Sequence, residues 1–110
     1  MTTGKPPIRS TYATDPDMRE LVEFFVQEMP GRITSLRKAF EAAELADLTR
    51  LAHQLKGASG GYGFPTIGTK AGELESALKS SSAPPTQTLA AIKANLDDLI
   101  DLCTRASTST

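Results

Sequence analysis

The sequence predicts an all-α fold, an antiparallel up-down bundle of four helices that forms one domain. Apolar residues recur at steps of three and four in four separate segments, which is the spacing of amphipathic helices. No segment alternates between apolar and polar residues over the length of a strand. The chain has 110 residues, no Trp and only 5% aromatic residues, so its core must be built mainly from Leu, Ile, Val and Ala. Such a composition favours helices packed on helices.

The first helix is predicted to begin at the Asp15-Pro16 step and to run to about residue 43. Asp15 can cap this helix, and Pro16 suits its first position because the φ angle of proline is already close to helical. Pro30-Gly31 lies inside the pattern, but the register continues through it, so a kink is expected in place of a break. The apolar seam of this helix consists of Val22, Val26, Met29, Ile33, Leu36, Phe40 and Ala43, widened by Leu21 and Phe25.

Three further helices are predicted over residues 45–62, from about Phe64-Pro65, and from about Thr86, which can serve as an N-cap. A loop rich in Ser and Pro separates the last two. Residues 15–106 would then form the bundle, with residues 1–14 as a flexible N-terminal segment or linker and residues 107–110 as a disordered tail. The expected core positions of these helices are Leu48, Leu51, Ala52, Leu55, Ser59, Tyr62, Ile67, Ala71, Leu74, Leu78, Leu89, Ile92, Leu96, Leu99 and Cys103.

Composition excludes several classes of function. The net charge is −1, from 12 basic and 13 acidic residues, so no strong field attracts nucleic acid or a membrane surface. With one cysteine, Cys103, and one histidine, His53, the chain can form no internal disulfide and has too few ligands for a structural zinc site. No stretch approaches the roughly 18 to 20 apolar residues of a membrane helix, and residues 1–14 lack the apolar run of a signal peptide. We therefore expect a cytoplasmic protein without nucleic acid or membrane partners. A monomer is expected as well, although nothing in the composition determines the oligomeric state.

The single histidine lies on the solvent side of the second helix. At about 100° per residue, the core positions of this helix point away from His53, whereas Arg50, Lys56, Gly57 and Gly60 fall within about 60° of it. Each glycine costs about 1 kcal/mol of helix stability relative to Ala. Two glycines on one exposed stripe remove side-chain bulk around the imidazole, which lets another protein approach closely.

These neighbours favour phosphoryl chemistry at His53. An imidazole nitrogen is a competent nucleophile near neutral pH. A transferring phosphoryl group needs in-line access and cations near its oxygens, and Lys56 and Arg50 lie one turn to either side of the ring. A lone histidine is more often structural, and each cation by itself would be ordinary surface charge. What favours phosphoryl chemistry is the combination of an exposed histidine, neighbouring glycines that leave space around its ring, and a lysine three residues on.

This stretch resembles the signature of a known family. The run His53-Gln54-Leu55-Lys56-Gly57-Ala58-Ser59, followed by Tyr62-Gly63, is similar to the H-x-L-K-G-[SA]-[SA] motif of histidine phosphotransfer (HPt) domains. The resemblance extends upstream through Leu48-x-x-Leu51-Ala52 and downstream through Ala71-x-x-Leu74-Glu75, and it covers roughly residues 16–104. The run Tyr62-Gly63-Phe64 is also similar to the phosphotransfer domain of chemotaxis kinases, so the subfamily stays open. The glycine pair at residues 60 and 61 and the Pro-Gly step in the first helix depart from many members.

The resemblance implies roles for individual residues. His53 would be phosphorylated through Nε2, with Lys56 stabilising the phosphoryl oxygens and Gly57 giving the partner room. Glu75 falls where many members hydrogen-bond the other ring nitrogen, although a plain surface glutamate is an equal alternative. Lys79, one turn on, is a weaker candidate for additional phosphate charge. The residues that would flank the site or give the partner access are Gln54, Gly60 and Arg50.

The function implied is that of a phosphorelay intermediate. The chain would exchange a phosphoryl group with the receiver-domain aspartate of response regulators or hybrid histidine kinases. It shows no nucleotide-binding loop and no carboxylate cluster, so it would be a stoichiometric carrier without ATP or a metal of its own. The Mg²⁺ that such transfers need would be held by the receiver. Two alternatives are a phosphorylated module of a larger hybrid or chemotaxis-type kinase, and a helical interaction bundle that is not phosphorylated.

Overall fold

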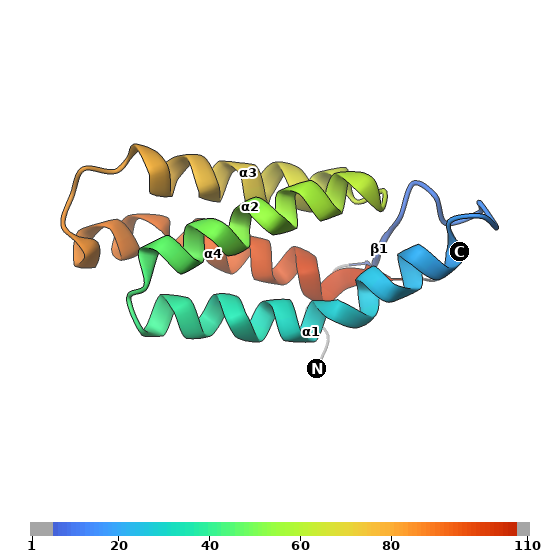
Figure 1. Cartoon of the computed structure of the whole chain (residues 1–110), viewed down its shortest axis with the longest axis horizontal. Coiled ribbons are helices and arrows are strands. Elements are labelled where there is room, and N and C mark those ends of the chain that lie inside the picture. The colour runs from blue at the N-terminus through green and yellow to red at the C-terminus, as the bar shows by residue number, and fades with distance from the viewer. Residues whose placement is uncertain (1–5, 108–110) are drawn as a thin grey trace.

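The computed structural model describes residues 6–107 and is mainly helical (Figure 1). Its four helices lie side by side along the long axis of the molecule, which confirms the predicted all-α class. The described residues also contain a pair of two-residue strands, which the sequence did not predict because so short a strand has no periodicity. In chain order the elements are β1 (Ile8–Arg9), α1 (Arg19–Glu41), α2 (Leu45–Gly61), α3 (Pro65–Ser80), α4 (Pro85–Arg105) and β2 (Ala106–Ser107).

The first helix begins at Arg19, later than the predicted Pro16. The carboxylate of Asp15 accepts a hydrogen bond of 2.9 Å from the backbone N–H of Asp17, and its carbonyl accepts one of 3.1 Å from Met18. An aspartate that bonds the backbone two residues on favours a turn over a helix. Asp15 therefore closes a turn ahead of α1, and its predicted role as the cap of this helix was wrong.

Prolines act differently in two of the helices. The α1 helix continues through Pro30 without a break, as the register of its apolar residues predicted. Figure 1 shows its ribbon bending part-way along, and a proline inside a helix is a usual cause because it removes a backbone hydrogen bond. The α4 helix begins at Pro85, because proline suits the first helical position. Thr86 therefore lies inside the helix, and its predicted role as the N-cap was wrong.

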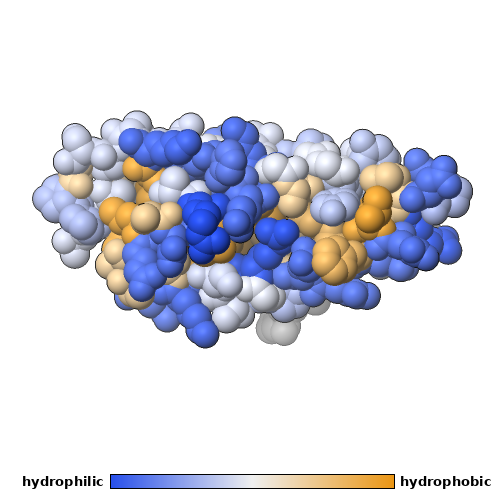
Figure 2. All heavy atoms as spheres, in the orientation of Figure 1, coloured by the Kyte–Doolittle hydropathy of each residue, from blue (hydrophilic) through white to orange (hydrophobic). Residues whose placement is uncertain are grey.

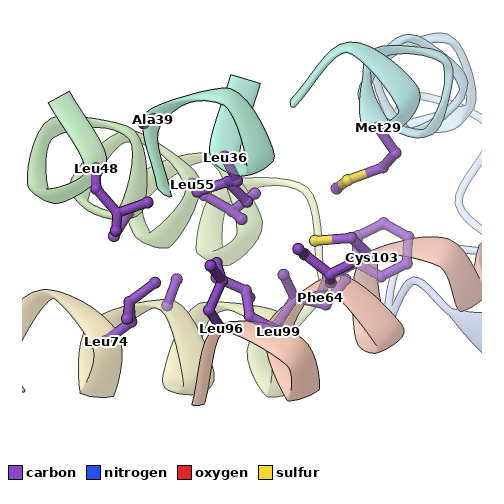
Figure 3. Close-up of a cluster of buried hydrophobic side chains, with 14 of the residues drawn as sticks. Met29, Leu36, Ala39, Leu48, Leu55, Phe64, Leu74, Leu96, Leu99 and Cys103 are labelled. Carbon is purple, nitrogen blue, oxygen red and sulfur yellow. The ribbon is translucent and has the colours of Figure 1, made fainter. Parts of the chain in front are cut away.

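The core lies between the four helices and is mainly aliphatic. The predicted positions in α3 are all buried, and those in α4 are buried except for the half-buried Leu89. In α2, Leu51 and Tyr62 are half-buried and the other predicted positions are buried. Figure 3 shows side chains from different helices turned toward one another, among them Leu36, Leu48, Leu55, Leu74, Leu96, Leu99 and Cys103.

Aromatic rings close one end of this core. Phe25 of α1 is fully buried, and its ring centroid lies 5.2 Å from those of both Tyr62 and Phe64. Offset and tilted ring pairs at this distance add to the stabilisation that burial provides. The prediction that Phe25 widens the apolar seam is therefore confirmed, whereas the same prediction for Leu21 was wrong because that side chain is 45% exposed. Ala43, the last predicted seam position, is also exposed.

The N-terminal segment contacts the chain where α2 ends and where α4 ends. β1 pairs in parallel with β2, so that Ile8 lies opposite Ala106. Ser10 is buried, and its hydroxyl donates a hydrogen bond of 2.6 Å to the carbonyl oxygen of Tyr62. The predicted flexible segment thus includes residues that contact the ends of α2 and α4, while its residues 1–5 lie outside the described residues. Of the predicted tail, Ser107 belongs to β2 and residues 108–110 lie outside the described residues.

The face seen in Figure 2 is mostly hydrophilic, with apolar patches between the polar side chains. One patch lies toward the right, over the first half of α1. This part of the helix carries Leu21 and Phe24, whose side chains are among the few large apolar ones that are exposed. The rest of the apolar seam of α1 faces the other helices.

Candidate functional site

The histidine lies near the middle of α2 with its side chain 69% exposed, as the helical geometry predicted. Its Nδ1 atom lies 2.8 Å from Oε2 of Glu75, a residue of α3. Because a carboxylate only accepts hydrogen bonds, a neutral His53 ring must carry its proton on Nδ1. Within residues 6–107, the other ring nitrogen, Nε2, has no hydrogen-bond partner. The contact therefore leaves Nε2 with a free lone pair on an exposed ring.

The carboxylate of Glu75 is buried, with 7% of its side chain exposed, and is shared by three basic groups. Besides the histidine, Nζ of Lys79 lies 3.1 Å from Oε2, and Nζ of Lys56 lies 3.8 Å from Oε1. The hydrogen bond from Lys79 lowers the pKa of Glu75 below its ordinary value, with the bond from His53 acting in the same direction, and these effects outweigh burial. Glu75 is therefore ionised at neutral pH.

The connection between α2 and α3 determines how their faces meet. Gly63 has a φ angle of 83°, in the left-handed region that favours glycine at the end of a helix. The N–H of Phe64 donates a hydrogen bond of 2.8 Å to the carbonyl of Ser59, which closes the last turn of α2. A Cβ atom at Gly63 would lie 2.7 Å from Oγ1 of Thr11 and 2.8 Å from Cδ2 of Tyr12. This reversal, which brings Glu75 back beside His53, therefore requires glycine.

Two glycines on α3 lie against α2, at distances where a Cβ atom would make ordinary van der Waals contact. A Cβ atom at Gly68 would lie 3.4 Å from the carbonyl oxygen of Lys56 and from Cβ of Ser59. A Cβ atom at Gly72, one turn on, would lie 3.4 Å from Cδ of Lys56. The sequence analysis did not single out either glycine. Their spacing of four residues, which places them on one face of α3, was the signal that could have identified them.

The glycines of α2 leave the surface beside His53 bare. A Cβ atom at Gly57 or Gly60 would meet nothing within 4 Å, so packing within the chain does not require glycine at either position. Gln54, next to the histidine, lines a groove of about 520 Å³ between α1 and α2, together with Gly31 and Leu51. This surface can admit a partner without rearrangement of α2.

Not every predicted residue joins the cluster. The guanidinium of Arg50 forms an ion pair of 3.5 Å with Asp47 and contacts neither His53 nor Glu75. Lys79, the weakest candidate from the sequence, is instead bonded to Glu75. In residues 6–107, no three His, Cys, Asp or Glu side chains are grouped so that they could hold a metal ion. None of the helices in that range is long and apolar enough to cross a membrane.

Comparison with known proteins agrees with this arrangement. No curated protein and no solved structure matches the chain significantly. The family model described as the Hpt domain matches residues 20–105, which extend from the first turn of α1 to the last residue of α4. Hpt domains are phosphocarrier modules that exchange phosphoryl groups with receiver domains and kinases in two-component phosphorelays. Because the match covers all four helices and the exposed histidine, the chain belongs to the Hpt domain family.

Proposed function

We propose that the chain is a phosphorelay intermediate that accepts a phosphoryl group on Nε2 of His53 from a receiver-domain aspartate and passes it to another receiver. One observation carries this proposal, the hydrogen bond of 2.8 Å between Nδ1 of His53 and Glu75. This bond specifies the tautomer in which Nε2 is the nucleophile, and the exposure of the ring makes that atom accessible.

The transfer is balanced without an external base. The lone pair of Nε2 attacks the phosphorus of the aspartyl phosphate, the new N–P bond forms, and the P–O bond to the aspartate breaks. The aspartate leaves as a carboxylate. The proton on Nδ1 stays in its hydrogen bond with Glu75, whose negative charge stabilises the positive charge that the phosphorylated ring acquires. Return of the phosphoryl group to a second receiver reverses these steps.

Lys56 and the glycines complete the proposed site. The ammonium of Lys56 lies 3.8 Å from Oε1 of Glu75, and the lysine side chain is more than half exposed, so the ammonium can turn toward phosphoryl oxygens on the ring. Gly57, the next residue, has no side chain that could keep the receiver away from the ring of His53. The receiver would supply the Mg²⁺ and its own acidic pocket, so the proposal assigns no cofactor to this chain. A monomeric state and a cytoplasmic location remain parts of the proposal.

The proposal includes the up-down order of the helices. In Figure 1 the α1–α2 and α3–α4 connections lie at one end of the molecule and the α2–α3 connection lies at the other. An antiparallel order of this kind places α2 and α3 next to each other, with His53 and Glu75 part-way along both helices. The site would then lie on the side of the bundle, where a globular receiver can reach it.

Incubation with a phosphorylated, Mg²⁺-loaded receiver domain tests the proposal. We expect acid-labile, base-stable phosphate on the wild type and none on His53→Gln, which keeps the fold because the side chain is exposed. Several receivers from the same genome should be used, because a mismatched pair can fail for lack of specificity. Labelling only by a kinase domain with ATP would support the kinase-module alternative. No labelling by either route would overturn the proposal in favour of an interaction bundle.

A further inference from the structure

We propose that Lys79 is a positioning residue, which holds the Glu75 carboxylate toward His53 and so leaves Lys56 free to contact the phosphoryl group. This inference deepens the proposed function and rests on it. The sequence made Lys79 only a possible extra cation for phosphate. The contacts of its ammonium group assign it a different role.

The two oxygens of Glu75 are occupied differently. Oε2 accepts a hydrogen bond from Nδ1 of His53 at 2.8 Å and forms an ion pair with Nζ of Lys79 at 3.1 Å. Among residues 6–107, the one basic group near Oε1 is Nζ of Lys56, at 3.8 Å, which is too long for a hydrogen bond. Lys79 thus bonds the same oxygen atom that orients the imidazole, whereas Lys56 is held loosely on the other.

Burial makes a cationic partner necessary. A carboxylate with 7% of its side chain exposed loses most of its hydration, and an unpaired buried charge is costly. Within residues 6–107, the charged or titratable groups that contact Glu75 are His53 and Lys56 from α2 and Lys79 from its own helix. The neutral imidazole supplies one hydrogen bond and no charge. Of the two lysines, Lys79 is the one whose ammonium lies at hydrogen-bond distance from the carboxylate.

The backbone supports this division between the lysines. Lys79 lies four residues after Glu75 on α3, so docking of a receiver does not change the spacing of the two residues along the helix. Lys56 reaches the site from α2 with its aliphatic chain across Gly72. The side chains of Lys56 and Lys79 are 56% and 64% exposed, so the distances to Glu75, and not exposure, distinguish the two lysines. When a phosphoryl group arrives on Nε2, Lys56 can leave Oε1 for the phosphoryl oxygens. Lys79 then remains to keep Glu75 ionised and bonded to Nδ1.

The experiment compares Lys79→Met, Lys79→Arg and Lys56→Met in the full chain. Lys93→Met is the matched control, because Lys93 also pairs with an acid four residues away but lies on α4. The first measurement is the titration of the Glu75 carboxyl carbon and the tautomer of the His53 ring by NMR, which needs no partner. The second is the rate of transfer from a phosphorylated receiver as a function of pH.

We expect Lys79→Met to move the titration of Glu75 and the acid limb of the transfer rate to higher pH. Its rate at neutral pH should fall by about tenfold, by analogy with the lower end of the loss seen when a residue that orients a metal-ligating histidine is removed. Lys79→Arg should restore both properties. Lys56→Met should lower the rate at every pH and leave the acid limb in place.

Two results would overturn the inference. An unchanged Glu75 titration in Lys79→Met would show that Lys79 does not hold the carboxylate. An equal, pH-independent loss of rate in Lys79→Met and Lys56→Met would show that both lysines face the phosphoryl group. If no receiver labels the wild type while Glu75 still titrates differently in Lys79→Met, the proposed function fails and the link between Lys79 and Glu75 stands.

Discussion

The aliphatic chain of Lys56 lies directly over Gly72. A Cβ atom on Gly72 would be 3.4 Å from Cδ and 3.6 Å from Cε of the lysine, which is ordinary van der Waals contact. The glycine therefore provides the surface on α3 along which Lys56 reaches toward Glu75. A larger side chain would occupy the path of the lysine, and this difference in size gives a test.

Gly72→Ala and Gly72→Leu should behave in opposite ways. The alanine fits against Lys56 and should raise the free energy of unfolding by up to about 1 kcal/mol through its helix propensity, with transfer unchanged. The leucine should displace Lys56 and lower the transfer rate as far as Lys56→Met does. Urea unfolding and the receiver assay measure the two effects. Normal transfer by Gly72→Leu would contradict the assigned path of Lys56.

The stability of the chain should depend on Glu75 in acid. Because the pKa of this carboxyl is lowered in the folded state, its contribution to stability is present above the ordinary value of 4.5 and is lost as the pH falls through the folded-state pKa. Urea unfolding between pH 7 and pH 3 should therefore show a smaller acid loss in Glu75→Gln than in the wild type. Glu73→Gln, on the exposed side of the same helix, is the control and should follow the wild type.

Gly57 should be dispensable for folding and required for docking. Since a Cβ atom there meets nothing within 4 Å, Gly57→Ala and Gly57→Leu should each be more stable than the wild type by up to about 1 kcal/mol. Transfer from a receiver should be close to normal in the alanine variant and strongly reduced in the leucine variant. Ala94→Leu, on an exposed position of α4, is the control for added bulk. Full activity of Gly57→Leu would mean that the partner does not pass over this residue.

The α1–α2 connection contains a strained alanine. Ala43 has a φ angle of 57°, and the hydrogen bond of 2.9 Å from Glu44 N–H to the Ala39 carbonyl identifies it as the left-handed residue that ends the helix. This conformation costs a non-glycine residue roughly 1 kcal/mol or more. Ala43→Gly should therefore raise the melting temperature by a few degrees, about 0.5 to 1 kcal/mol in free energy. Ala94→Gly, inside a helix, should lower the melting temperature. A lower melting temperature in both variants would show that the backbone of Ala43 is not strained.

The periodicity of the sequence predicted the features that are set within a single helix. The steps of three and four identified four helices, the buried positions of α3 and the outward direction of His53, because 3.6 residues per turn relate spacing directly to the face of a helix. Helix ends were less predictable. Asp15 can cap a helix or close a turn, and the two uses differ by small local energies.

Tertiary structure decided which side chains meet across helices. The sequence left Glu75 equally placed as a surface glutamate or as the partner of His53, since the choice depends on the rotation and offset of α3 against α2. The left-handed turn at Gly63 directs the chain back along α2 into α3, and no local periodicity shows the resulting offset. The pairing of β1 with β2 joins residues far apart in the sequence, and no local pattern encodes it. The ion pair between Lys79 and Glu75, by contrast, joins residues four apart on one helix, a spacing that the sequence does show. The sequence by itself therefore determined the helices and the exposure of His53. The packing of α3 on α2 determined that Glu75 contacts its ring.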